Sequence, residues 1–294
     1  GQCIHSMRRF GSAEQLRKTA ESTMETGDPA YALALTEPGA GSDNNSATTS
    51  YTRKNGKVYL NGQKTFITGA KEYPYMLVLA RDPEPKDPKK AFTLWWVDSK
   101  KPGIKVNPLH KIGWHMLSTC EVYLDDVEVD ESDMVGEEGM GFLNVMYNFE
   151  MERLINAARS TGFAECAFED AARYANQRIA FGKPIGHNQM IQEKLALMAI
   201  KIDNMRNMVL KVAWQADQEQ SLRTSAALAK LYCARTAMEV IDDAIQIMGG
   251  LGYTDEARVS RFWRDVRCER IGGGTDEIMI YVAGRQILKD YQNK

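Results

Sequence analysis

The stretch Thr36-Glu37-Pro38-Gly39-Ala40-Gly41-Ser42-Asp43 decides how the rest of the chain is interpreted. It follows an apolar, strand-like run at residues 31–35. Pro38 removes a backbone donor and ends the strand, while the two glycines let the chain turn sharply. Thr36 and Ser42 place hydroxyl groups on either side of the turn, where free backbone N–H groups can hold an anion. The stretch predicts a strand followed by a ligand-holding turn, and an ordinary strand-to-loop turn is the alternative.

Composition narrows the class of protein. The 294 residues are 44% hydrophobic and 26% charged, which is usual for a globular protein with a real core. The formal net charge is −2, and no long run of one sign occurs, so we expect no nucleic-acid partner. The longest apolar runs, such as residues 75–80, are too short to span a bilayer, so we expect no membrane insertion.

Cysteine and histidine are scattered along the chain. The residues are Cys3, Cys120, Cys166, Cys233, Cys268, His5, His110, His115 and His187. No two cysteines have metal-ligand or redox spacing, so we expect free thiols in a reducing compartment and no metal site.

The chain changes character along its length. Ser12, followed by Glu14 and Gln15, predicts a helix that runs through Thr26 and ends at Gly27. The dipeptide at residues 55–56, Asn-Gly, is a strong hairpin signal. The predicted strands are residues 31–35, 48–53, 57–60, 75–81, 92–98, 104–107 and 120–124. The predicted long helices are residues 139–177, 190–218, 222–248 and 276–291.

These elements predict an α+β protein in which a small β barrel or sandwich is followed by a C-terminal four-helix bundle. We expect a remnant of an N-terminal helical domain at residues 1–28, a middle β domain at 29–130, and the bundle at 131–294.

Three motifs in order carry a family resemblance. They are the stretch at residues 36–43, Asn61-Gly62-Gln63-Lys64-Thr65-Phe66-Ile67-Thr68, and Ile271-Gly272-Gly273-Gly274-Thr275. Together they resemble the acyl-CoA dehydrogenase family over essentially the whole chain. The family resemblance implies the same β-then-bundle fold. Relatives carry an all-helical domain ahead of the first motif, so we expect that domain to be largely missing, together with any targeting segment.

A closer resemblance is carried by residues 166–178 and 260–265. These residues resemble the crotonobetainyl-CoA reductase branch and an enterobacterial short-chain acyl-CoA dehydrogenase paralogue of fatty-acid β-oxidation. The resemblance implies a bacterial, cytoplasmic enzyme with a short acyl substrate.

The resemblance implies FAD as the cofactor. Thr36 matches a residue at the flavin pyrimidine edge, and Ser42 matches one near the pyrophosphate and the thioester substrate. Thr68 matches the threonine that hydrogen-bonds flavin N5, and Phe66 matches an aromatic residue against the ring. Leu33 departs from the family, because relatives often have tyrosine there.

A second cofactor set is implied in the bundle. Residues 178–183 resemble a segment that reaches the FAD diphosphate of a neighbouring subunit, although Ala180 replaces a residue that is often hydroxylated. The implied cofactor residues are Arg178, Phe181, Gln189, Gln246, Gly249, Gly250, Thr275 and Glu277. A helix C-cap is the alternative for the two glycines at 249–250. The set implies a homo-oligomer, usually a tetramer in this family.

The catalytic base is the informative position. Many relatives carry a glutamate where this chain has Gly273, whose N–H is implied to stabilise the enolate oxygen. A branch of the family places the base on a helix in a Glu-Arg pair, and Glu152 and Arg153 match it. Glu152 is therefore the predicted base and Arg153 a predicted substrate contact. The alternative is that Glu152 is a solvent-facing helix residue.

The resemblance implies α,β-dehydrogenation of a short-chain acyl-CoA, or the reverse enoyl-CoA reduction, with electrons exchanged with an electron-transfer flavoprotein. The bound cofactor carries the redox chemistry, while the protein positions it. A weakly active or inactive flavoprotein scaffold and an acyl-CoA oxidase are the alternatives.

Overall fold

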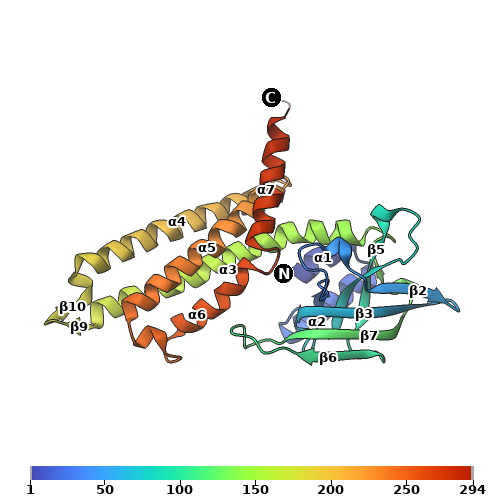
Figure 1. The fold of residues 1–294 in the computed structure, drawn as a ribbon, viewed down its shortest axis with the longest axis horizontal. Coiled ribbons are helices and arrows are strands. Elements are labelled where there is room, and N and C mark those ends of the chain that lie inside the picture. The colour runs from blue at the N-terminus through green and yellow to red at the C-terminus, as the bar shows by residue number, and fades with distance from the viewer. Residues whose placement is uncertain (1, 293–294) are drawn as a thin grey trace. The chain divides into compact units, whose positions relative to one another are not determined.

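The computed structural model describes residues 2–292 (Figure 1). The chain divides into two compact units, Gly1–Asn148 and Phe149–Lys294, which we describe separately. The predicted division into three domains, with boundaries near residues 28 and 130, stays a prediction.

The first unit begins with two helices, α1 (Gln2–Phe10) and α2 (Ala13–Thr26). A capping box opens α2, in which Ser12 accepts from the backbone of Gln15 and the Gln15 side chain accepts from the backbone of Ser12. Gly27, with a φ of 76°, ends the helix in the left-handed region. The predicted helix is confirmed at both ends, whereas α1 had not been predicted.

One eight-stranded sheet forms most of this unit. Its strands are β1 (Tyr31–Ala34), β2 (Ser50–Lys54), β3 (Lys57–Thr68), β4 (Tyr75–Arg81), β5 (Phe92–Asp98), β6 (Ile104–Pro108), β7 (Thr119–Val129) and β8 (Met134–Val135). The order is β6-β7-β3-β2-β4-β5-β8, and β1 pairs in parallel with β4.

The sheet is open. Its path begins at β6 and ends at β8, and among the residues described these two strands do not pair, so the sheet does not close into a barrel. The predicted β domain followed by a helical domain is confirmed, and of the two forms that were predicted for the β domain, barrel or sandwich, a closed barrel is not the one observed. Residues in the middle of β4 and β5 are buried in unbroken runs, so these strands lie at the centre of the core.

The second unit consists of long helices. They are α3 (Gly141–Gln177, which begins in the first unit), α4 (Gln189–Asp217), α5 (Arg223–Met248), α6 (Arg258–Val266) and α7 (Asp276–Tyr291). A short hairpin of β9 (Ile179–Ala180) and β10 (Lys183–Pro184) joins α3 to α4. The four predicted helices end within two residues of their predicted bounds. The nine-residue α6 had not been predicted.

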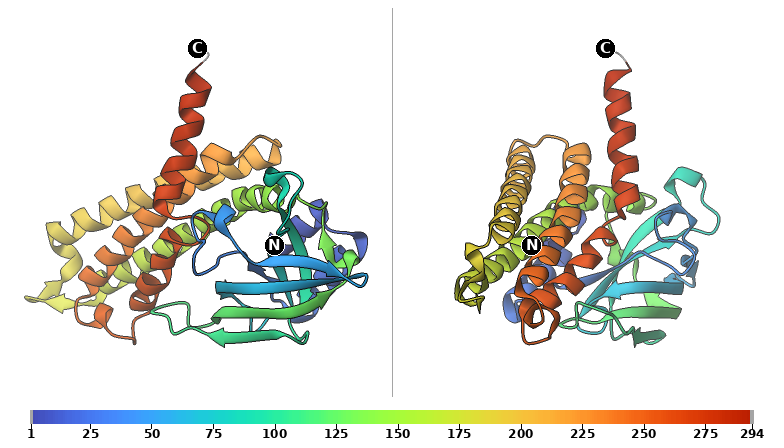
Figure 2. Two further views of the ribbon diagram at one scale, coloured as in Figure 1. Left: turned by 45° about the vertical axis from the view of Figure 1, so that its right-hand side comes forward. Right: turned by 60° about the vertical axis from the view of Figure 1, so that its left-hand side comes forward.

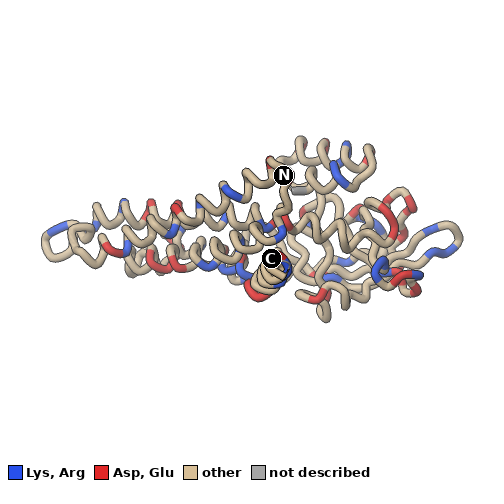
Figure 3. The backbone as a smooth tube through the Cα atoms, turned by 90° about the horizontal axis from the view of Figure 1, so that it is seen from above, with Lys and Arg blue, Asp and Glu red and all other residues tan. Residues whose placement is uncertain are grey.

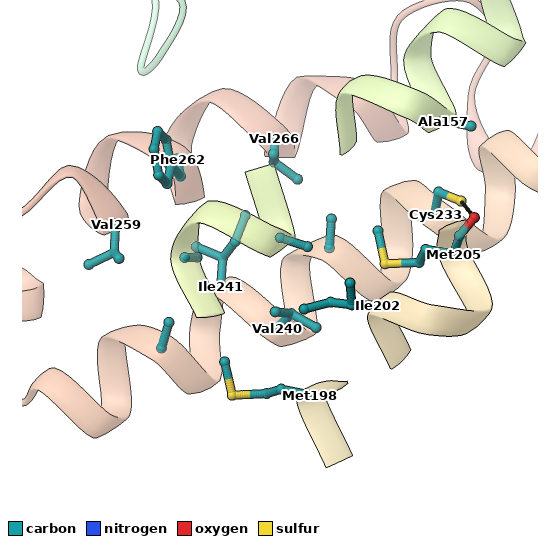
Figure 4. Close-up of a cluster of buried hydrophobic side chains, with 14 of the residues drawn as sticks. Ala157, Met198, Ile202, Met205, Cys233, Val240, Ile241, Val259, Phe262 and Val266 are labelled. Carbon is teal, nitrogen blue, oxygen red and sulfur yellow. Dashed lines mark hydrogen bonds between the residues drawn. The ribbon is translucent and has the colours of Figure 1, made fainter. Parts of the chain in front are cut away.

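Apolar side chains from four helices, α3, α4, α5 and α6, make the core of this unit (Figure 4). Met198, Ile202 and Met205 of α4 lie with residues of α5 and α6, and all are buried. The first part of helix α7 packs on α5, where Met279 and Ala283 are buried with Ala227, and its C-terminal part projects away (Figures 1 and 2).

Acidic and basic residues are interspersed along both units (Figure 3). Among the helices of residues 2–292, none is long and apolar enough to cross a membrane.

Candidate active site

The glycine-rich turn of the first unit follows β1 directly. The N–H of Glu37 donates to the carbonyl of Ala40 over 3.0 Å, and the N–H of Ala40 donates back to the carbonyl of Glu37 over 3.1 Å. Thr36 is half-buried at the start of this turn, and Ser42 is exposed beyond it. The turn therefore presents two hydroxyl side chains around a closed backbone loop.

A buried ion pair ties this turn to strand β3. Lys64 is fully buried, and its Nζ lies 2.9 Å from Glu37 Oε1 and 3.0 Å from the carbonyl oxygen of Leu35. Glu37 also accepts from the backbone N–H groups of Thr48, at 2.7 Å, and Thr49, at 2.9 Å. The first two sequence motifs thus form one structure, although neither residue of the pair had been predicted to matter.

The electrostatics of the pair favour an ionised carboxylate. Burial by itself would raise the pKa of Glu37, but Lys64 and the donors from Thr48 and Thr49 outweigh it and lower the pKa to about 2. Burial lowers the pKa of Lys64, and the carboxylate of Glu37 counteracts that shift. Glu37 therefore remains charged at neutral pH.

The second motif also presents Phe66 and Thr68. The N–H of Thr65 donates to the carbonyl of Thr36 over 2.8 Å, which brings the two motifs side by side. The pairing of β3 with β7 shifts register between Lys64 and Ile67, and Phe66 there has a φ of 57° and an exposed ring. Thr68 is exposed, with its Oγ1 3.4 Å from Thr119 Oγ1.

The second unit brings together the two predicted catalytic residues. Glu152 is half-buried on α3, and a Cβ atom added to Gly273 would lie 3.4 Å from Glu152 Oε1. Among the described residues, the N–H of Gly273 finds no protein acceptor. A carboxylate and an uncommitted backbone donor therefore lie side by side.

Arg153 is buried next to Glu152 in the chain. Its guanidinium lies 5.8 Å from the ring centroid of Phe149, and its Nε has no hydrogen-bond partner among the described residues. Burial lowers the pKa of Arg153, while the carboxylates of Glu152 and Glu150 counteract the shift.

The glycine turn at residues 272–274 is held from both sides. The N–H groups of Ile271 and Gly272 each donate to the carbonyl of Cys268 over 2.9 Å. Beyond the turn, Thr275 caps α7 by accepting from the N–H of Ile278 over 3.3 Å. The predicted cofactor residue Glu277 is exposed in the first turn of α7.

Three residues that support this turn had not been predicted. Asp276 is buried and receives hydrogen bonds from Arg235, at 2.9 Å, and Arg270, at 2.8 Å. Lys230 donates to the carbonyl of Gly274. Asn156 lies against the turn, since a Cβ on Gly273 would lie 2.6 Å from its Nδ2. A signal for Lys230 was present, because it interrupts an otherwise apolar helical stripe.

The remaining predicted cofactor residues lie at one end of the helical unit. The hairpin after α3, the start of α4 and the end of α5 gather there (Figures 1 and 2). The exposed residues at this end are Arg178, Phe181, Gln189, Gln246, Gly249 and Gly250. Phe181 has a φ of 51° and a fully exposed ring.

Gly249 ends α5, as the alternative interpretation predicted. Its φ is 59°, and its N–H donates to the carbonyl of Ile245 over 2.9 Å. The helix C-cap is therefore confirmed, and a ligand contact by the same exposed glycines stays a prediction.

Comparison with known proteins assigns this fold to a class of enzymes. The middle domain of acyl-CoA dehydrogenases matches residues 32–127, and their C-terminal domain matches residues 139–288. The chain therefore belongs to the acyl-CoA dehydrogenase family, whose members are FAD-dependent flavoenzymes.

Individual relatives agree. Probable acyl-CoA dehydrogenase YdiO of Escherichia coli K12 is 97% identical over 294 residues, which are all of this chain and 77% of that protein. The structure of butyryl-CoA dehydrogenase from Megasphaera elsdenii superposes with a TM-score of 0.92 at 34% identity, covering 98% of this chain and 75% of that one. A chain from a study of the electron transferring flavoprotein of Acidaminococcus fermentans superposes with a TM-score of 0.93 at 33% identity, covering 98% and 76%.

Proposed function

We propose that this enzyme removes the Cα proton of an acyl-CoA thioester with Glu152 and stabilises the resulting enolate oxygen with the N–H of Gly273. The observation that carries the proposal is the Glu152 carboxylate beside the uncommitted N–H of Gly273. A base must reach the proton that it removes, and a donor must reach the oxygen on which charge develops. A glycine at position 273 places no side chain beside the carboxylate of Glu152.

The chain's own side chains suit FAD, which supplies a hydride acceptor when it is bound. The first unit presents the hydroxyls of Thr36, Ser42 and Thr68 and the exposed ring of Phe66 around joined backbone segments. Such hydroxyls can bond the polar edge of a flavin, while an aromatic ring can stack against its face. In the second unit, Thr275 and Glu277 follow the glycine turn directly.

The second cofactor set supports an oligomer. Glu152 lies on α3, and Arg178 directly follows the last residue of that helix, Gln177. The 25 helical residues between them span about 38 Å. One FAD molecule does not bridge that distance between its flavin and its diphosphate. We infer that Arg178 and its exposed neighbours bind the FAD of a second copy in a homo-oligomer, and the family resemblance supports a tetramer.

The relatives support a proposal for the substrate class and the redox partner. Structural likeness to a butyryl-CoA dehydrogenase supports a short acyl chain. Likeness to a chain studied with an electron transferring flavoprotein supports such a flavoprotein as the partner. We infer a role in bacterial, cytoplasmic fatty-acid oxidation, with the reverse enoyl-CoA reduction open to the same site.

The test is anaerobic bleaching of the yellow FAD-reconstituted protein by butyryl-CoA. Glu152→Gln should keep FAD and bind the thioester, but bleach about 10²–10⁴-fold more slowly, because the general base is lost. Glu169→Gln is the matched control, since Glu169 lies on the same helix in an exposed pair with Arg173. Near wild-type bleaching by Glu152→Gln would contradict the base assignment.

Two further outcomes separate the alternatives. Hydrogen peroxide formed in air at the rate of turnover would indicate an oxidase instead of a dehydrogenase. A wild-type protein that holds FAD but is bleached by no acyl-CoA would indicate a flavoprotein scaffold.

A further inference from the structure

Lys230 is a lysine buried on an otherwise apolar face of α5. It lies on the face of α5 that also carries Ala226, Cys233 and Ala237, and all four residues are fully buried. Its ammonium donates to the carbonyl of Gly274 and, among the described residues, has no carboxylate within ion-pair distance. Burying a charge without a direct partner is costly, so hydrophobic packing alone does not account for a lysine here.

The groups that face Lys230 belong to the candidate site. Glu152 and Arg153 act on it from α3, and Glu269 and Asp276 act on it from the segments before and after the glycine turn. Burial lowers the pKa of Lys230 to about 8, although Asp276 and Glu269 counteract the shift. The ammonium is thus embedded among the residues that surround Gly273.

We propose that Lys230 is a positioning residue that fastens the glycine turn through the Gly274 carbonyl, and so holds the N–H of Gly273 beside Glu152. The inference rests on the proposed function, because it takes that N–H as the donor to the enolate oxygen. Lys230 touches neither the thioester nor the proton, so it acts through the turn.

The turn needs such an anchor. Gly272, Gly273 and Gly274 are consecutive, and φ is 66° at Gly273 and 99° at Gly274. Glycine loses the most conformational freedom on folding, so three in a row do not hold a backbone donor in place by themselves. The neighbouring anchors hold Gly272, whose N–H donates to the carbonyl of Cys268, and Asp276 beyond the turn, but neither bonds the backbone of Gly273 or Gly274. A donor misplaced by about 1 Å can cost about 10²-fold in rate.

The decisive measurement uses acetoacetyl-CoA, a 3-ketoacyl thioester that enolises without being oxidised. Its apparent α-proton pKa when bound to the FAD-loaded protein, read from the ultraviolet absorption of the enolate, reports the oxyanion donor directly. Lys230→Met should raise that ligand pKa by about 1–2 units, equivalent to about 10–100-fold weaker enolate stabilisation. The kcat with butyryl-CoA should fall by a similar factor, while KM changes little.

Lys230→Gln separates the hydrogen bond from the charge. Glutamine is neutral but can still donate to a carbonyl, so its enolate shift should lie between those of the wild type and Lys230→Met. It also carries the test if the methionine variant does not fold. Lys211→Met, on the exposed face of α4, is the matched control and should leave the ligand pKa unchanged.

Wild-type enolisation in both Lys230 variants would overturn the proposal. A failure of the base assignment gives a different result, namely rapid bleaching by Glu152→Gln. A failure of the dehydrogenase assignment appears as absent bleaching in the wild type, and the enolisation equilibrium still reports on Lys230.

Discussion

Replacing Lys64 by methionine should destabilise the first unit, because the carboxylate of Glu37 then stays buried without its cation. The lysine is fully buried, and methionine fills a similar volume without a charge. The change leaves the carboxylate of Glu37, which is only 5% exposed, with the amides of Thr48 and Thr49 but without its cation. An uncompensated buried charge is the expected cause of the loss.

Two estimates of the stability lost in Lys64→Met agree. The pKa of Glu37 is lowered from 4.5 to about 2, and a difference of about 2.5 units corresponds to about 3 kcal/mol. Removing one partner of a buried ion pair typically costs about 3–5 kcal/mol. We therefore expect Lys64→Met to lower the free energy of unfolding by about 3 kcal/mol.

A double-mutant cycle isolates the interaction. Glu37→Gln keeps acceptors for the amides of Thr48 and Thr49 but removes the charge. Lys64→Met combined with Glu37→Gln should therefore recover about 2 kcal/mol of the loss from Lys64→Met alone. Lys57→Met is the matched control on the same strand, because Lys57 pairs with Asp130 in an exposed ion pair and exposed pairs contribute little.

The assay is urea unfolding, followed by tryptophan fluorescence, to which Trp95 and Trp96 of β5 contribute from this unit. Hydrogen exchange at the amides of Thr48 and Thr49 measures whether their hydrogen bonds to Glu37 are kept. The FAD absorbance that the protein retains shows whether the turn still binds the cofactor. If Lys64→Met were no more destabilising than Lys57→Met, or the two changes were additive, the buried pair would not hold the two motifs together.

Three further predictions concern other parts of the site. Arg178→Ala should weaken FAD retention and oligomer stability together, whereas Arg173→Ala, in the last turns of α3 just before Arg178, should change neither. FAD absorbance after gel filtration at several concentrations is the measurement. Gly273→Ala should lower kcat and lower the free energy of unfolding by about 1–3 kcal/mol, because φ at this position is 66°. Gly162→Ala is the control and should do neither, because a Cβ there meets open space; enzyme assays and urea titration compare the two variants. The stabilisation from Glu37 should be complete above pH 4.5 and lost as pH falls towards 2, since its pKa is lowered in the folded state; acid titration with Glu37→Gln as the reference measures it.

Local signals in the sequence predict much of the fold. The capping box at Ser12 and the glycine at residue 27 define both ends of α2, because these residues satisfy the backbone groups of the helix ends. The Asn-Gly pair at residues 55–56 joins β2 to β3. Helices α1 and α6 are nine residues each, and short helices depend on tertiary packing more than on propensity. Whether a sheet closes depends on which distant strands pair, and the local pattern does not specify that pairing.

The candidate site also has a part that the sequence suggests and a part that it does not. The motifs suggested that residues 152 and 273 belong together, because the resemblance gives a glutamate at one of the two positions, and the structure brings Glu152 and Gly273 close together. Their supports were not, because Asn156, Lys230 and Asp276 come from three elements and meet only in the folded chain. Buried lysines on apolar faces are nevertheless visible as exceptions to a pattern, and such exceptions concentrate at functional sites.

Lys230 shows why such an exception is informative. Its pKa is lowered from 10.5 to about 8, so between those values the folded state holds fewer protons than the unfolded state, and stability rises with pH. Below about pH 8 the buried charge destabilises the fold by the full amount, about 3 kcal/mol. The lost hydrogen bond to Gly274 offsets about 1 kcal/mol of the gain from removing that charge.

Lys230→Met should therefore be more stable than the wild type at pH 7, by about 2 kcal/mol, and the difference should shrink towards pH 10.5. The same change should lower kcat, because the turn loses its anchor. A residue kept only for the fold would lower both quantities when it is replaced. Urea titrations of the two proteins at pH 7 and pH 10 measure the difference. A variant that is less stable than the wild type at pH 7 would contradict the destabilisation assigned to the buried charge, and the enolisation test of Lys230→Gln would still decide the positioning role.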